Sequence, residues 1–128
     1  MPILIPVSAG ELIDKITILE IKSERMADPA KLANVRRELE LLRTTWAASP
    51  LAGRDVAKLV AELKAVNEAL WEIEDAIRAK EAARAFDAGF VELARSVYRT
   101  NDRRATIKRE LNVALGSDLI EEKSYERY

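Results

Sequence analysis

The stretch that decides the fold is VAKLVAELKAVNEALWEIEDAI, residues 56–77. Its apolar residues recur three and four positions apart, which places them on one stripe of a helix and at the a and d positions of a heptad. These residues are Val56, Leu59, Leu63, Val66, Leu70, Ile73 and Ile77. The spacing predicts a helix over residues 55–85 with a coiled-coil-like seam. At about 1.5 Å per residue it is about 45 Å long, so a helix of this chain or of a second copy must cover it.

Three further helices are predicted from capping residues and from the same apolar spacing. Ser8 and Glu11 form a capping box, in which the hydroxyl and the carboxylate each accept a backbone N–H at the start of a helix. Asp28 followed by Pro29 reads as an N-cap with proline at the first helical position. Gly116 is a natural C-terminal cap. The four predicted helices span residues 8–27, 29–47, 55–85 and 87–115.

Both ends of the chain are predicted to be non-helical. Residues 1–7 are apolar and contain two prolines, which favours an extended arm, with a frayed terminus as the alternative. Residues 117–128 carry apolar and aromatic residues among charges, which favours a docked tail. The sequence therefore predicts a single all-α domain over residues 1–128. It is an antiparallel bundle of about four long amphipathic helices with coiled-coil-like seams, an extended N-terminal arm and a docked C-terminal tail.

The composition excludes most familiar enzyme mechanisms. The 128 residues include no Cys and no His, so disulfides, cysteine-ligated zinc, thiol nucleophiles and histidine acid–base pairs are all impossible. A formal charge of −1 gives no overall attraction to nucleic acid or to anionic membranes. The first residues lack the basic region and the length of a targeting or membrane-spanning segment. We expect a cytoplasmic protein with no cofactor, no nucleic-acid partner and no membrane association.

One candidate site is acidic. Glu68, Glu72 and Asp75 have a helical spacing that can hold Mg²⁺ in a bundle, which leaves metal-assisted hydrolysis open as an alternative. In the heptad of the third helix, however, all three fall at the outer c and f positions. The same assignment places Glu11 and Asp14 on the outer face of the first helix. We therefore expect these carboxylates to point into solvent, and we expect no metal site.

The second candidate site is basic and polar, and it interrupts the apolar seam of the fourth helix. Arg104 falls at an a position and Thr100 at a d position, while Asn101 and Lys108 flank the seam at e positions. An unpaired arginine in an apolar interface costs several kcal/mol, so Arg104 must meet a carboxylate, a bound anion or water. The candidate ligand-binding residues are Thr100, Asn101, Arg103, Arg104, Lys108 and Tyr125.

Two functions of different classes follow from this second site. The leading hypothesis is a non-catalytic helical interaction or assembly module, in which Arg104 pairs with a glutamate of a neighbouring helix or with the acidic tail. The alternative is binding of a small anionic ligand such as a nucleotide or sugar phosphate, with or without turnover. Guanidinium, ammonium and carboxamide donors suit phosphate and carboxylate oxygens. The long third and fourth helices favour a homodimer in either case.

Five blocks of the sequence are specific enough, taken together, to identify a family. They are IPVSAGELIDKITILEIK (5–22), KLANVRREL (31–39), LWEIED (70–75), VYRTNDRR (97–104) and EEKSY (121–125). Together they resemble a family of short bacterial proteins known only as a domain of unknown function. The resemblance covers nearly the whole chain and implies a bacterial, single-domain protein of this length. It implies no catalytic residue, substrate or cofactor.

Overall fold

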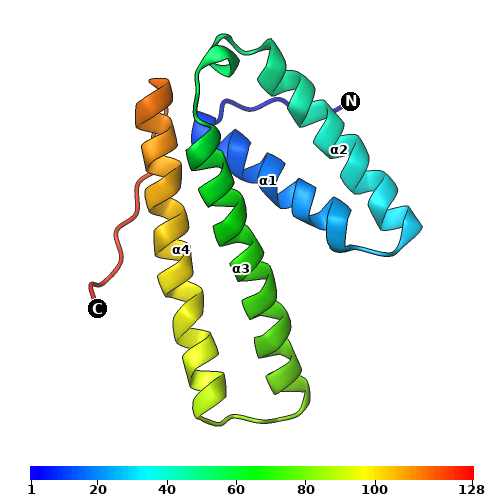
Figure 1. The fold of residues 1–128 in the computed structure, drawn as a ribbon, viewed down its shortest axis with the longest axis vertical. Helices are drawn as coiled ribbons and strands as arrows, with labels where there is room; N and C mark the ends of the chain where they lie inside the picture. The colour runs from blue at the N-terminus through cyan, green and yellow to red at the C-terminus, as the bar shows by residue number, and fades with distance from the viewer.

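The computed structural model describes residues 1–128 and contains four α-helices, one short 3-10 helix and no strand. The elements are α1 (Ala9–Arg25), α2 (Pro29–Ala48), η1 (Pro50–Gly53), α3 (Ala57–Ala82) and α4 (Ala88–Leu115). Figure 1 shows two helical hairpins, α1–α2 and α3–α4, with an extended arm before α1 and a tail that runs back along α4. The predicted all-α fold with an extended arm and a docked tail is confirmed. None of the helices combines the length and the apolar character that a membrane span requires.

Capping residues mark the starts of α1 and α2 and the end of α4. The Ser8 hydroxyl accepts the backbone N–H of Glu11 at 3.1 Å, and the Asp28 carboxylate accepts N–H groups in the first turn of α2. Gly116 ends α4 in the left-handed conformation, with a φ of 64° that suits a residue without a Cβ. The second half of the predicted capping box is wrong, because the Glu11 carboxylate accepts a hydrogen bond from Lys108 instead.

The turn between α3 and α4 ends α3 at Ala82, before the predicted residue 85. Arg84 adopts a left-handed conformation with a φ of 53°, which cannot continue a right-handed helix. The side chain of Asp87 then caps α4 by accepting the N–H of Phe90 at 2.9 Å. The reversal of the chain therefore uses residues that the apolar spacing had assigned to the helix.

The central helix, α1, buries two of its faces. Leu19 packs with Val35 and Leu39 of α2. Another face carries Ile13 into the main core between α3 and α4. The remaining buried residues of that core are Ala9, Leu63, Val66, Ile107, Leu111 and Leu115. Because α1 contacts all three other helices, little of its surface is left for an outer face.

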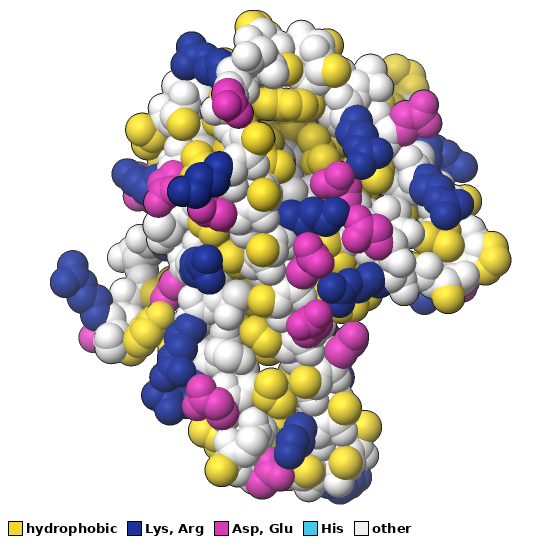
Figure 2. Space-filling view, in the orientation of Figure 1, with side chains coloured by type: hydrophobic (Ala, Val, Ile, Leu, Met, Phe, Trp, Pro, Cys, Tyr) yellow, Lys and Arg dark blue, Asp and Glu magenta, His cyan; other side chains and the backbone are white.

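The α3–α4 hairpin extends beyond the α1–α2 hairpin (Figure 1). Where α1 covers the hairpin, Leu63 is fully buried, whereas Ile73 and Ile77 farther along the same seam are only half-buried. Phe86, at the free end, is 61% exposed. In Figure 2, apolar side chains are visible toward this end, while basic and acidic side chains are interspersed over the middle of the molecule. Of the predicted seam, only Leu63 and Val66 in its middle are therefore buried, and its other residues are half-buried.

Candidate functional site

A buried polar network joins α1, α3 and α4. Asp14 of α1 is only 3% exposed, and its carboxylate accepts a hydrogen bond from the Asn67 side-chain amide of α3 at 2.8 Å. The same amide donates to the Thr17 hydroxyl at 3.0 Å, and this hydroxyl donates to the Asp14 carbonyl at 2.8 Å. The expectation that Asp14 points into solvent is therefore wrong. It failed because it assumed one buried face for α1, which buries two.

Lys108 of α4 lies at the other end of this network. Its ammonium donates to Glu11 at 2.7 Å and to Glu121 of the tail at 3.0 Å, and it lies 3.5 Å from Asp14. The side chain is 7% exposed. Burial acts to lower the pKa of Lys108, but the bonds from Glu11 and Glu121 and the charge of Asp14 outweigh it, and the net pKa is raised above 10.5. Lys108 is thus a buried, fully paired cation rather than an open ligand-binding group.

The tail is docked on α4 by side-chain contacts instead of secondary structure. Glu121 reaches Lys108, and the hydrogen bond from that ammonium holds the pKa of Glu121 below its ordinary 4.5. Glu122 pairs with Arg109 at 2.9 Å, and the hydroxyl of Tyr128 donates to Asp102 of α4. These contacts hold both ends of residues 121–128 against the helix and leave a groove beneath the chain between them.

Arg104 differs from Lys108 although the two lie one turn apart on α4. Its side chain is half-buried, yet it makes no ion pair and no hydrogen bond with another side chain of the protein. The expected ion pair of Arg104 with a helix glutamate or with the tail is therefore not formed, although the charge of Arg104 helps to lower the pKa of Glu121 in the tail. The carboxylates of α1 and the tail converge on Lys108 because it is Lys108 that faces α1 at this level of the bundle.

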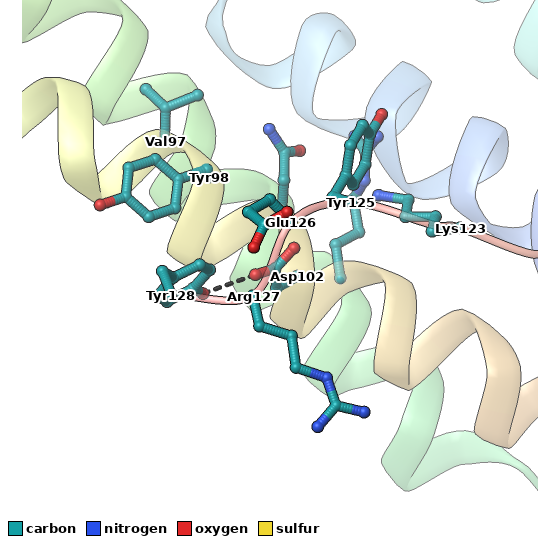
Figure 3. A pocket seen from close by; sticks show the side chains of 10 residues that line it. Val97, Tyr98, Asp102, Lys123, Tyr125, Glu126, Arg127 and Tyr128 are labelled. Atoms are coloured by element: carbon teal, nitrogen blue, oxygen red, sulfur yellow. Dashed lines mark hydrogen bonds between the residues drawn. The ribbon is translucent and has the colours of Figure 1, made fainter.

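Arg104 lines a groove of about 790 Å³ between α4 and the tail, which Figure 3 shows from close by. Asn101 and Tyr125 line the same groove, so the structure brings together three of the six candidate residues. The remaining lining residues are Val97, Tyr98, Asp102, Lys123, Glu126, Arg127 and Tyr128. The charged residues of the groove are three cations, Arg104, Lys123 and Arg127, and two carboxylates, Asp102 and Glu126.

Arg104 also borders a second cavity, of about 360 Å³, where α1, α3 and α4 meet. Its apolar wall includes Ile21 and Trp71, and Asn67 of the buried network reaches it as well. Two carboxylates, Glu74 and Asp75, and one further cation, Arg78, line this cavity. Arg104 therefore lines two cavities, and cations outnumber carboxylates only in the groove beside the tail.

The other candidate residues lie elsewhere. Thr100 and Arg103 border a separate depression of about 310 Å³ beside α3, and Arg103 is exposed. In the acidic candidate, Glu68 and Glu72 both approach Arg25, at 3.4 and 3.5 Å. No group of three or more Asp or Glu residues is arranged to hold a metal ion.

Sequence reasoning missed two polar contacts that hold α1 against the other helices. Asn67 was not singled out, although it directly follows the seam residue Val66. Asn112 accepts the backbone N–H of Gly10 at 2.6 Å. A Cβ at Gly10 would lie 2.6 Å from the carbonyl oxygen of Lys108, so this crossing of α1 and α4 requires glycine. An amide next to an apolar seam residue was the only local signal for either contact.

Comparison with known proteins identifies one family. The model described as "Family of unknown function (DUF6165)" matches residues 3–128. No curated protein and no solved structure matches the chain. The match includes α1, α4 and the tail, and thus both walls of the groove and all partners of Lys108.

Proposed function

We propose that this chain, which belongs to the family of unknown function DUF6165, binds a small anionic ligand in the groove between α4 and the tail. One observation carries the proposal: Arg104 is half-buried at the groove wall and has no carboxylate partner. The competing explanation for Arg104 was an internal ion pair, and in this structure Lys108 makes that pairing instead.

The chemistry of the groove suits an oxyanion. A guanidinium offers parallel N–H donors that match two oxygens of a phosphate or carboxylate. Asn101 lies one turn earlier on the same face of α4 and adds an amide donor. The tail adds the positive charges of Lys123 and Arg127 and the negative charge of Glu126, while the Asp102 carboxylate already accepts the hydroxyl of Tyr128. The proposal is one of binding, and it assigns no catalytic step to the groove.

The proposal is tested by thermal unfolding in the presence of inorganic phosphate, pyrophosphate and a panel of phosphorylated metabolites. A ligand at 100 times its Kd stabilises the folded protein by about 2.7 kcal/mol. We expect such a shift for the native protein and its loss in Arg104→Met. Arg103→Met is the matched control, because Arg103 is exposed and outside the groove, and it should retain the shift.

The control also separates binding from a general salt effect. Phosphate strengthens apolar burial in any protein by its exclusion from the surface, and this effect is independent of Arg104. Only the part of the shift that Arg104→Met removes and Arg103→Met keeps is attributed to the groove. If no anion gives such a difference, the proposed function is wrong.

A second candidate function is assembly with a second copy of the chain, and the N-terminal arm is the observation that favours it. Ile3, Leu4 and Ile5 are 91%, 89% and 70% exposed, and burial of apolar surface favours association by about 25 cal/mol per Å². The second copy is the chosen partner because the heptad seam of α3 is incompletely covered at Ile73 and Ile77. Sedimentation velocity should show a dimer that is lost on deletion of residues 1–7. A full-length chain that stays monomeric at every concentration excludes this candidate.

A further inference from the structure

We infer that the ligand of this groove is a mononucleotide, whose base stacks on Tyr125 and whose phosphate is bound by Arg104. The inference rests on the proposed function and adds to it the class of ligand. It starts from the distribution of aromatic residues, because all three tyrosines of the chain line this one groove. The other aromatic residues, Phe86, Phe90, Trp46 and Trp71, do not border it.

Two of the tyrosines are already engaged with the protein. The rings of Tyr98 on α4 and Tyr128 on the tail pack edge to face, with their centroids 4.9 Å apart. The Tyr128 hydroxyl also donates to Asp102 (Figure 3). These contacts account for the placement of both rings as part of the tail's attachment to α4, so neither is needed for a ligand.

Tyr125 has no such role. It is 80% exposed and has no aromatic partner, and the ammonium of Lys123 lies 5.9 Å from its ring centroid. Attachment of the tail does not explain this ring, because Glu121, Glu122 and Tyr128 supply those contacts. Stacking of a base on such a ring strengthens binding by about 5-fold to 150-fold.

The arrangement of the groove matches a ligand with two chemically different ends. Arg104 and Asn101 project from α4, whereas Tyr125 and Lys123 belong to the tail that forms the other wall. The volume of about 790 Å³ lies within the range of sites for small organic ligands, about 300 to 1,000 Å³, and exceeds what a phosphate alone would fill. A sugar phosphate would satisfy Arg104 but would leave the face of Tyr125 uncovered.

The same features favour a single nucleotide over a nucleic-acid strand. Proteins that bind single strands present successive aromatic platforms along a basic track. This groove has one unpartnered aromatic ring, and the whole chain has a formal charge of −1. It can therefore stack one base and neutralise one phosphate group.

The test is isothermal titration calorimetry with the four ribonucleoside 5′-monophosphates, ribose 5-phosphate, adenosine and inorganic phosphate. We expect at least one nucleotide to bind about 5-fold or more tightly than ribose 5-phosphate, and adenosine to bind more weakly than that nucleotide. Tyr125→Ala should reduce nucleotide affinity to that of ribose 5-phosphate without changing the latter. Tyr125→Phe should keep the difference, and so should Phe86→Ala, which removes an exposed ring at the far end of the α3–α4 hairpin.

Each contrary outcome identifies what is wrong. Equal affinities for nucleotides and ribose 5-phosphate, or a preference that survives Tyr125→Ala, overturn the nucleotide inference while the proposed anion binding stands. An oligonucleotide that binds more than about 10-fold tighter than the best mononucleotide overturns it in favour of a nucleic-acid strand. If no phosphorylated probe binds, the nucleotide inference and the proposed function are both wrong. Circular dichroism of each variant establishes that it is folded.

Discussion

Two cations one turn apart on α4 show how burial and partners assign different roles to similar side chains. Lys108 is 7% exposed and meets three carboxylates, so it contributes to the structure of the α1–α4 interface. Arg104 is half-buried without a carboxylate and faces two cavities. Both sites obey the same requirement that a buried charge must be compensated. The protein itself compensates Lys108, and we propose that a ligand compensates Arg104.

Lys108→Met should strongly destabilise the fold. The substitution leaves Asp14 buried without its cation, whereas Glu11 and Glu121 are partly exposed and can turn toward water. Removing one partner from a buried ion pair costs about 3 to 5 kcal/mol. Urea denaturation measures the change, and Arg103→Met, an exposed site, should stay within about 0.5 kcal/mol of the native protein. A loss below about 1 kcal/mol for Lys108→Met would contradict the network.

Gly10→Ala should also destabilise the protein, through sterics alone. The added Cβ would lie 2.6 Å from the Lys108 carbonyl oxygen, a backbone atom that can move only if α1 and α4 separate. Overpacking of this kind costs about 1 to 3 kcal/mol. Gly53→Ala is the matched control, since its Cβ meets nothing within 4 Å, and it should be neutral or stabilising by up to about 1 kcal/mol. Equal midpoints of thermal unfolding for the two variants would show that α1 does not approach α4 this closely.

At the scale of elements, the tail is unusual because electrostatic contacts hold it in place. It has no helix or strand, and its attachment depends on pairs such as Glu121 with Lys108. Since the tail forms one wall of the groove, these pairs also determine whether the groove exists. Loss of the charge on Glu121 or on Lys108 should therefore detach the tail and open the groove at the same time.

Acidification should release the tail. The pKa of Glu121 is lowered in the folded state, so its contribution is present above its ordinary pKa of 4.5 and is lost as the pH falls below that value. Lys108 has a raised pKa, so its charge is lost only above 10.5 and does not contribute to this acid transition. The NMR lines of residues 119–128 should become narrower as the pH is lowered below 4.5, because the released tail becomes mobile.

The variant Glu121→Gln isolates that carboxylate. It should loosen the tail already at neutral pH, because the charge-assisted hydrogen bond to Lys108 becomes a neutral one. The helices should remain folded, since the tail contributes none of the buried core. A tail that stays equally ordered in this variant and in acid would show that Glu121 does not hold it.

At the scale of the whole molecule, α1 is the helix that contacts α2, α3 and α4, and the α3–α4 hairpin projects past it (Figure 1). Only α3 and α4 contact each other at the free end, where Ile77 is half-buried and Phe86 is exposed. Regions with few buried apolar contacts open at lower free energy than the core. The two ends of one hairpin should therefore differ in stability.

Hydrogen exchange should reveal this gradient. At concentrations where the chain is monomeric, amides near Ile77 and Leu93 should exchange faster than amides near Leu63 and Leu111, which are fully buried. Protection of the free end that grows with protein concentration would support the proposed assembly with a second copy. Uniform protection in the monomer would contradict the difference in packing.

The sequence alone determined that four helices form, and it identified three of their capping residues. The helix predicted from the 3-4 apolar spacing of α3 and the caps predicted at Ser8, Asp28 and Gly116 are confirmed. These signals depend only on residues a few positions apart. It also singled out Asn101, Arg104 and Tyr125, which line one groove, although their role in binding stays a proposal.

Only the tertiary structure decided which charge is paired and where the groove lies. The partners of the network are far apart in the chain: Asn67 and Asp14 are separated by 53 positions, and Lys108 and Glu11 by 97. A heptad assignment made on one helix assumes that the helix has one buried face. Because α1 has two, the assignment wrongly placed Asp14 on a solvent-exposed face. A pattern within one helix does not show how distant helices pack against each other. That packing decides which charged side chains are buried, and a buried charge needs a partner.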